Sequence, residues 1–289
     1  MADGTTAVED AGQRSLSGPA VLFVPAANER ALAKAPTLGA DAIIYDLEDA
    51  VAPAERPAAR ERLRAALTGP RPRLTAIRIT HPAEADFTEN LLAARALRPD
   101  AIVVPKVEGT GDLDVVTAAL EQTDAAPSLR LWAMIETPRG VQHVAPIAAS
   151  GGRLAALVAG TNDLSAATGA HRAHMHPWLM AIVLAARANG LVALDGVHND
   201  LEDGAACEAE AREGAAMGFD GKTLVHPSQI DPCRAGFRPS DAEASHARAI
   251  VRAFRSEPEA GVLKVDGAMV ERMHLAAARR TLVRMGETS

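Results

Sequence analysis

The sequence predicts a (β/α)8 barrel of the TIM type, followed by a C-terminal helical extension. Eight short, nearly continuous apolar runs follow one another along the chain, and Ala-rich stretches of helix-forming residues separate them. Runs of this kind are typical of parallel strands covered by helices on both faces, because half-exposed antiparallel strands would alternate. Eight βα units in about 210 residues fit a closed barrel, and a doubly wound sheet is the alternative.

The expected strands cover residues 21–25, 42–47, 74–80, 101–107, 129–136, 154–161, 191–197 and 222–226. The helical connections cover residues 54–67, 86–97, 113–122, 178–189 and 204–217. Gly39, Gly190 and Gly218 close three helical stretches just before the next strand, where a left-handed C-cap is expected. The barrel should therefore span residues 19–238.

The two ends of the chain have a different character. Residues 1–18 are rich in Gly, Ala, Ser, Thr and acids without an apolar period, which predicts a flexible leader. Residues 239–289 form a C-terminal segment, with an expected helix over 242–254 and a second helical stretch at the end.

Composition narrows the classes of protein to consider. With 48% hydrophobic and 23% charged residues, the chain has an ordinary globular composition. The net charge of −7 argues against non-specific binding to nucleic acid or to an anionic membrane surface. Two cysteines are too few for a disulfide framework, and no stretch resembles a signal peptide or a membrane span. We therefore expect a cytoplasmic protein without nucleic-acid or membrane partners.

Polar residues follow the predicted strands, and in a barrel they would converge on one mouth. They are Pro25, Asp46, Glu48, Asp49, Arg78, Lys106, Glu136, Asp163, Asp195 and His226. Each one alone could equally be a solvated rim residue, and Glu48 and Asp49 could instead favour the first turn of the next helix.

Glu136 and Asp163 end two successive strands and together predict a cation site. Mg²⁺ prefers oxygen ligands and commonly takes one or two carboxylates, with water and substrate completing its shell. A 2-oxo acid could chelate such an ion, which as a Lewis acid would stabilise an enolate or alkoxide during retro-aldol or retro-Claisen cleavage. The alternative is structural: Glu136 would pair with Arg139, and Asp163 would cap the following helix.

Six short strings occur in order: LFVP at 22–25, YDLEDAV at 45–51, VPKVE at 104–108, IET at 135–137, GTNDL at 160–164 and HPSQI at 226–230. Together they resemble the citrate lyase β-subunit family within the HpcH/HpaI aldolase superfamily, which includes malyl-CoA and citramalyl-CoA lyases. The resemblance implies a TIM barrel assembled as homotrimers or hexamers, with Mg²⁺ held by Glu136 and Asp163.

The resemblance also implies substrate contacts. Arg78 would grip the oxygens of the substrate, for which its planar fork is suited. The backbone around Gly160, Thr161 and Asn162 would bind substrate as well. The CoA phosphates would lie near the first βα segment, which offers Asn28, Arg30 and Lys34.

Two positions depart from the family pattern. Asn162 stands where relatives commonly have an acid, which removes a negative charge beside the metal. Glu271 follows Met269-Val270 where the CoA lyases place a catalytic aspartate on a lid over a neighbouring subunit. Glu271 is our candidate acid or base, and a solvated glutamate at a helix start is the alternative. Asp266, before Gly267, is expected in a turn.

Lys106 has two possible roles. It could pair with Glu48 or Glu108 and hold the acidic cluster in place, or it could form a Schiff base. The metal pair already supplies an electrophile, which favours pairing. His171, His174 and His176 are interpreted as a surface or substrate-gate loop rather than as metal ligands.

These observations predict a Mg²⁺-dependent carbon–carbon lyase that cleaves or forms a small 3-hydroxyacyl-CoA such as malyl-CoA or citramalyl-CoA. In this interpretation Arg78, Glu48, Lys106 and Glu271 serve catalysis. Alternatives are an aldolase for free 4-hydroxy-2-oxo acids and a malyl-CoA thioesterase. A non-catalytic subunit that binds a 2-oxo acid, or a subunit of a multi-protein lyase, belongs to another class.

Overall fold

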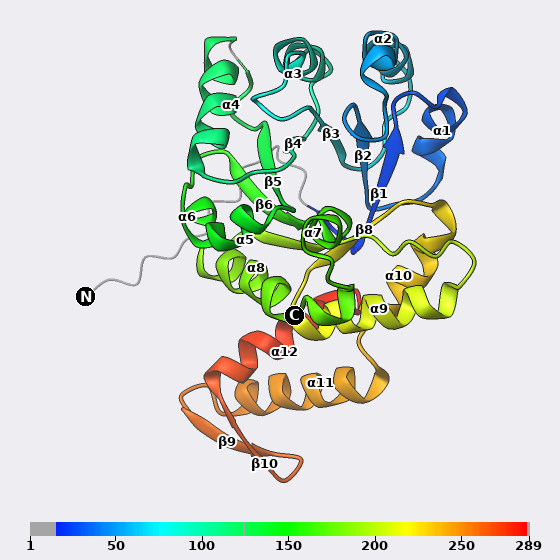
Figure 1. Ribbon diagram of the computed structural model, residues 1–289. Helices are drawn as coiled ribbons and strands as arrows, with labels where there is room; N and C mark the ends of the chain where they lie inside the picture. The colour runs from blue at the N-terminus through cyan, green and yellow to red at the C-terminus, as the bar shows by residue number, and fades with distance from the viewer. Residues whose placement is uncertain (1–15, 124, 288–289) are drawn as a thin grey trace.

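The computed structural model describes residues 16–123 and 125–287, and its centre is a closed barrel of eight parallel strands (Figure 1). The strands pair in chain order, and Leu22 of β1 lies opposite Leu224 of β8 where the barrel closes. The strands are β1 (Ala20–Pro25), β2 (Ala42–Asp46), β3 (Thr75–Arg78), β4 (Ala101–Val104), β5 (Arg130–Ile135), β6 (Leu154–Ala159), β7 (Val192–Asp195) and β8 (Gly221–Leu224). The predicted fold class is confirmed.

Helices surround the barrel and connect successive strands (Figure 1). They are α1 (Glu29–Lys34), α2 (Arg56–Ala66), α3 (Phe87–Ala96), α4 (Thr110–Gln122), α5 (Pro138–Gln142), α6 (Val144–Ala148), α7 (Thr161–Thr168), α8 (His176–Ala188), α9 (Gly204–Met217) and α10 (Ile230–Phe237). Short 3-10 turns are η1 (Ala35–Thr37), η2 (Pro53–Glu55), η3 (Arg172–His174) and η4 (Pro227–Gln229). The sequence did not predict α5, α6 and α7 as helices. Gly190 and Gly218 end α8 and α9 with positive φ, as expected.

Side chains alternate between two buried layers along each strand, as the period of two demands. One layer fills the inside of the barrel and includes Ile44, Ala76, Met134 and Leu194. The other lies between the strands and the helices and forms the largest core. Because the inside is packed with side chains, the barrel is a core and not a pore.

Most strands end earlier than the apolar runs that predicted them. Leu47, Ile79 and Val107 follow their strands and are fully buried. They stay apolar because they pack in the core, although they no longer belong to a strand. Of the predicted leader, residues 1–15 lie outside the described residues, and Leu16 packs against the interior layer.

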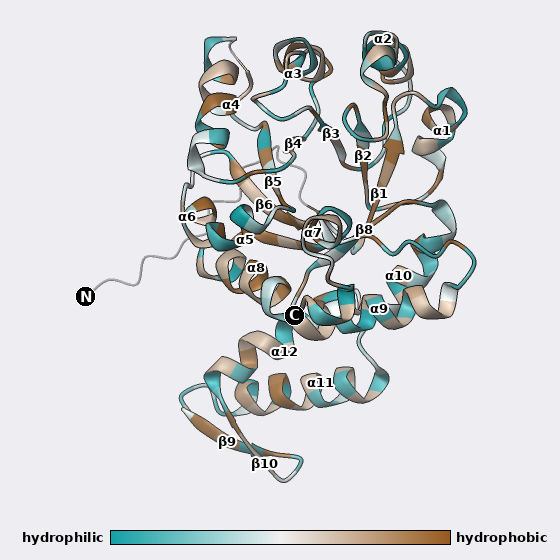
Figure 2. Cartoon of the chain, viewed as in Figure 1, coloured by the Kyte–Doolittle hydropathy of each residue, from teal (hydrophilic) through white to brown (hydrophobic). Residues whose placement is uncertain are grey.

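The C-terminal segment contains a β-hairpin that the sequence analysis did not predict. Between α11 (Asp241–Ser256) and α12 (Arg272–Arg284), strands β9 (Val262–Val265) and β10 (Ala268–Glu271) pair antiparallel. Asp266 and Gly267 form the two-residue turn with φ of 50° and 84°, the backbone that Asp-Gly favours in tight hairpins. The hairpin extends away from the barrel, and Figure 2 shows its apolar strands. Within the described part of the chain, no helix is long and apolar enough to cross a membrane.

Candidate active site

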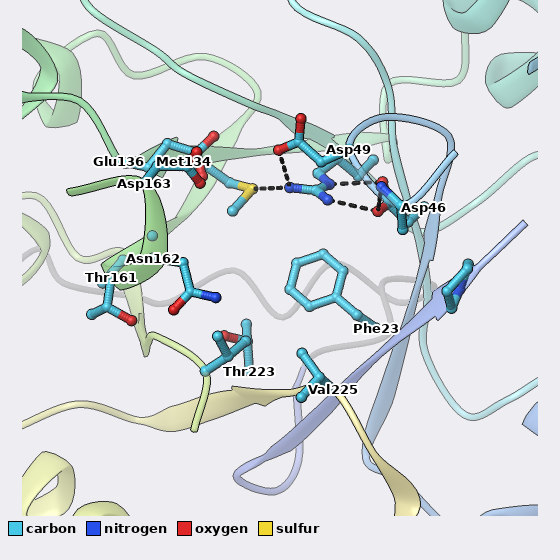
Figure 3. Close-up of a pocket in the computed structure, with 16 residues that line it drawn as sticks. Phe23, Asp46, Asp49, Met134, Glu136, Thr161, Asn162, Asp163, Thr223 and Val225 are labelled. Atoms are coloured by element: carbon cyan, nitrogen blue, oxygen red, sulfur yellow. Dashed lines mark hydrogen bonds and ion pairs between the residues drawn. The ribbon is translucent and has the colours of Figure 1, made fainter. Parts of the chain in front are cut away.

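A cavity of about 510 Å³ opens at the carboxyl ends of the barrel strands. Its walls come from six of the eight strands or the residues directly after them, and from the loop that follows β7. Figure 3 shows Glu136, Asp163 and Met134 on one side, Asp46 and Asp49 on the other, and the Phe23 ring between them. Six strand ends therefore deliver acidic, basic and apolar groups to one place.

Glu136 follows β5 and is almost completely buried, with 1% of its surface exposed. Its Oε1 accepts a hydrogen bond of 2.8 Å from the backbone N–H of Lys106, which has a left-handed φ of 50°. Its Oε2 is buried without a hydrogen-bond partner among the described residues. Burial raises the pKa of Glu136 to about 8, and the negative charge of Asp163 adds to this, although Arg78 opposes it.

Asp163 lies in the first turn of α7, directly beside Glu136 in the cavity (Figure 3). Gly160 makes this approach possible, because a Cβ at that position would lie 2.2 Å from the Glu136 Cβ. The Asp163 carboxylate forms no hydrogen bond or ion pair with any described residue. The structural alternative is therefore wrong: Asp163 does not cap α7, and Arg139 faces Glu108 at 3.7 Å instead of Glu136.

The residues present fit a hard divalent cation. The Glu136 Oε2 atom lacks a donor within the described chain, the Asp163 carboxylate is unpaired there, and all candidate ligand atoms are oxygen. Among the residues that the structure describes, no group of three or more His, Cys, Asp and Glu could hold a metal. Two carboxylates with room for water and substrate suit Mg²⁺, whereas a zinc site would need three or four protein ligands.

Arg78 ends β3 and lines the same cavity as the two carboxylates. Its Nε and Nη2 atoms donate to the two oxygens of Asp46 at 2.7 Å and 2.6 Å. Its remaining nitrogen, Nη1, lies 3.1 Å from Glu48 Oε2, and the guanidinium stacks 5.0 Å from the Phe23 ring centre. Despite its burial, the carboxylate of Asp46 holds the pKa of Arg78 above its ordinary value. Arg78 is therefore a fixed cation, and each of its three nitrogens has a partner within the described chain.

Lys106 pairs with Glu48 and Asp49, and not with Glu108. Its Nζ donates to Glu48 Oε1 and lies 3.1 Å from Asp49 Oδ1. Partial burial would lower the pKa of Lys106, but its hydrogen bond to Glu48 raises the pKa well above its ordinary value. A lysine held protonated is a poor Schiff-base nucleophile. Glu48 is fully buried, and burial raises its pKa to about 7.

The predicted substrate-binding residues fall into two groups. Gly160, Thr161 and Asn162 line the cavity. Arg30 and Lys34 do not: they are exposed on α1, and their side chains form no hydrogen bond or ion pair with the rest of the described chain.

Glu271 is likewise absent from the cavity wall. It ends β10 opposite Val262. Neighbouring residues of a strand point to opposite faces, and Val270 is buried against α11 and α12. Glu271 therefore belongs to the outer face of the hairpin, together with the exposed Met269.

The structure corrects the placement of two strand-end residues. Asp195 points away from the mouth and into the layer beneath α9, where Arg172, Lys222 and Glu210 surround it. We call these four residues the α9 charge cluster. His226 is exposed and bonds Ser228 Oγ at 2.7 Å, outside the cavity wall.

The sequence analysis did not single out four of the wall residues. Met134, Val197, Thr223 and Val225 line the cavity. A signal for Met134 existed, because it lies two residues before Glu136 and therefore on the same face of β5. Val197 and Val225 follow their strands, where no period applies.

A closed parallel barrel with an oxygen-lined cavity at its carboxyl ends, a candidate cation site, defines the class of this protein. The sequence pattern of the HpcH/HpaI aldolase/citrate lyase family matches residues 19–227, and the chain belongs to this family. It is 42% identical to a (3S)-malyl-CoA thioesterase of Cereibacter sphaeroides over 91% of this chain and 93% of that protein. It is 31% identical to the mitochondrial citramalyl-CoA lyase of Homo sapiens, over 91% and 84% of the two chains.

Solved structures agree with these relatives. Protein CitE from Mycobacterium tuberculosis, in complex with magnesium, acetoacetate and coenzyme A, superimposes with a TM-score of 0.80. The two sequences are 36% identical, and the match covers 94% of this chain and 99% of that chain.

Proposed function

We propose that this protein is a Mg²⁺-dependent carbon–carbon lyase that cleaves, or forms, a small 3-hydroxyacyl-CoA such as malyl-CoA or citramalyl-CoA. The observation that carries the proposal is the buried Glu136 Oε2, which has no donor in the described chain, beside the unpaired Asp163 in a cavity that Arg78 also lines. The names of the relatives support it, since one is a citramalyl-CoA lyase and another structure holds magnesium with coenzyme A.

In this proposal Glu136 and Asp163 hold Mg²⁺, which supplies Lewis-acid stabilisation of the oxygens of the 2-oxo-acid fragment. The positive charge of Arg78 acts on the same oxygens, while Asp46 and Glu48 fix the guanidinium. Gly160, Thr161 and Asn162 line the substrate's side of the cavity. Glu48 is fully buried and cannot contact substrate, so it acts through its ion pair with Arg78. Lys106 acts through its ion pairs with Glu48 and Asp49.

The reaction also needs proton transfers. Cleavage removes the proton of the 3-hydroxyl, breaks the bond between C2 and C3, and returns a proton to C2 of the acyl-CoA fragment. Glu271 is our candidate for the group at C2. Its place on the outer face of the hairpin, away from the cavity of its own chain, supports a role over the cavity of another copy in a homotrimer or hexamer.

Coenzyme A needs a cationic contact for its phosphates. Arg30 and Lys34 remain our candidates, because both side chains are exposed and free of partners among the described residues, on the helix that follows β1. The domain division into a leader (1–18), barrel (19–238) and lid (239–289) is part of the proposal. So is a cytoplasmic location, which suits the free thiols of Cys207 and Cys233.

Hydrolysis of malyl-CoA is a second candidate function, favoured by the 42% identity to a (3S)-malyl-CoA thioesterase. The same cation and Arg78 could act on a thioester carbonyl, with water in place of the C2–C3 cleavage. The two functions differ in their products. Cleavage of malyl-CoA gives glyoxylate and acetyl-CoA without a free thiol, whereas hydrolysis gives malate and free CoA thiol.

One assay separates these functions. Purified protein with Mg²⁺ is given malyl-CoA or citramalyl-CoA, and 2-oxo acid and free thiol are measured in parallel. We expect 2-oxo acid to appear before any free thiol, and we expect the activity to disappear when EDTA removes the metal. Thiol without 2-oxo acid would assign hydrolysis instead, and cleavage of free 4-hydroxy-2-oxo acids alone would assign an aldolase. Tight Mg²⁺-dependent binding of a 2-oxo acid without any turnover would assign a non-catalytic subunit.

A further inference from the structure

Two asparagine side chains form a reciprocal pair at the edge of the cavity. Asn162 lies on α7 directly before Asp163, and Asn199 lies on the loop of residues 196–203 that follows β7. Asn162 Nδ2 donates to Asn199 Oδ1 at 3.1 Å, and Asn199 Nδ2 donates to Asn162 Oδ1 at 2.7 Å. Each side chain thus donates one hydrogen bond to the other and accepts one from it. Two carboxylates could not form this pair, because an ionised carboxylate has no hydrogen to donate.

The loop after β7 is itself anchored on both sides of Asn199. Gly196 packs against the start of α7, since a Cβ there would lie 2.4 Å from Thr161 Oγ1. Gln229 is buried at 2% exposure, and its Nε2 donates to the carbonyl oxygen of His198 at 2.8 Å. Asn199 is therefore presented to Asn162 by a fixed loop.

Asp163 depends on its surroundings for its position, because its carboxylate has no hydrogen bond or ion pair with any described residue. On one side, Gly160 fits the first turn of α7 closely against Glu136. On the other side, Gly196 and the amide pair hold the same turn. These two sets of contacts leave the carboxylates of Glu136 and Asp163 facing one cavity.

We infer that Asn199 is a positioning residue for the Glu136–Asp163 cation site, and that it acts through its amide pair with Asn162. The inference rests on the proposed cation site. Groups that orient metal ligands without contacting the metal commonly contribute about 10-fold to 100-fold to metal affinity. The pair is exposed at the rim, so we expect the lower end of that range.

The test is a double-mutant cycle on the full chain, with metal binding as its first readout. Mn²⁺ binding is followed by EPR and Mg²⁺ binding by calorimetry, both without substrate, for wild type, Asn199→Ala, Asn162→Ala and the double variant. Each single variant should weaken binding about 10-fold, and the double variant should be no more than about twofold weaker than either single one. Asn199→Asp retains the bond that Asn162 donates and should give an intermediate loss.

Asn189→Ala is the matched control. Its side chain donates a hydrogen bond to Ala185 O at 2.9 Å at the C-terminal end of α8, and its removal should leave metal binding unchanged. Wild-type Mn²⁺ affinity in Asn199→Ala, or losses that simply multiply in the double variant, would overturn the inference.

Turnover separates the inference from the proposed function. If the cycle shows coupling but no acyl-CoA is cleaved, the proposed function fails and the positioning role holds. If wild type cleaves substrate but the cycle shows no coupling, the inference alone fails. If the wild type shows no Mn²⁺ binding that is lost in Glu136→Gln, both the inference and the proposed function fail.

Discussion

Two clusters of charged side chains lie at strand ends of this barrel, and they differ in how completely their carboxylates are bonded. In the α9 charge cluster every oxygen of Asp195 and Glu210 has a donor or cationic partner: Arg172, Lys222, His198 or the Gly196 N–H. At the cavity, Glu136 Oε2 has none among the described residues. A buried acid alone is therefore weak evidence of a functional site in this protein, whereas a buried acid with an unsatisfied oxygen is a candidate for one.

The largest expected effect comes from removing that oxygen. Glu136→Gln should lower kcat/KM for acyl-CoA cleavage by about 10²-fold or more, because it removes a ligand charge from the cation. The variant should remain folded, because glutamine has nearly the shape of the protonated glutamic acid that the raised pKa gives near neutral pH. Steady-state kinetics and circular dichroism measure the two effects. Activity near that of wild type would show that Glu136 is only another structural acid.

The α9 charge cluster should respond in stability instead. Lys222→Met leaves the fully buried Asp195 without one of its two cationic partners and should reduce the free energy of unfolding by about 3–5 kcal/mol. Urea unfolding measures the loss. Lys264→Met, at an exposed position of the hairpin, is the matched control and should change stability by less than about 0.5 kcal/mol. A stability loss no larger than that of the control would remove the contrast between the clusters.

A third prediction concerns the close contact between the start of α7 and Glu136 at the cavity. A methyl group in Gly160→Ala would lie 2.2 Å from the Glu136 Cβ, so the start of α7 must move and Mg²⁺ affinity should fall by about 10-fold to 100-fold. Calorimetric titration gives the affinity. Gly111→Ala, where the added carbon meets nothing within 4 Å, is the control. Equal affinities in the two variants would mean that the contact between α7 and Glu136 is not needed.

The smallest of these effects should be the dependence of Mg²⁺ affinity on pH. With its pKa raised to about 8, Glu136 carries a proton near neutral pH, and a cation must displace it. Mg²⁺ affinity should therefore rise by up to about tenfold per pH unit until about pH 8 and level off above it. Titrations of the wild type across this range test the slope. A flat profile in wild type would contradict the raised pKa.

The barrel and the two metal-ligand candidates could be predicted from the sequence, because both depend on short apolar runs and on the polar residues at their ends. Glu136 lies an even number of residues after Trp132 and Met134, which face the barrel interior. Its side chain therefore points to the same side of the strand, into the mouth of the barrel. Asp195 directly follows the interior Leu194 and so faces the helices. Applying the same period to β7 would have corrected that prediction, since a shift of one residue reverses the face.

Other features of the site depend on contacts between distant segments, which no local pattern of apolar and polar residues indicates. The amide pair joins residues from two different βα loops, whose relative position is set only by the closed barrel. The donor missing at Glu136 is likewise a property of the packed site. The hairpin is different, because Asp266-Gly267 between apolar residues is a recognisable turn signal that could have predicted β9 and β10.

The unsatisfied oxygen of Glu136 also bears on how long the folded chain survives. A buried acceptor without a donor makes folding less favourable, and any ion that binds only the folded state shifts the balance back in proportion to its concentration. Supply of the divalent ion would then set the fraction of chains open to proteolysis as well as the fraction competent for turnover. Degradation rate and activity would respond to the same ion through one carboxylate.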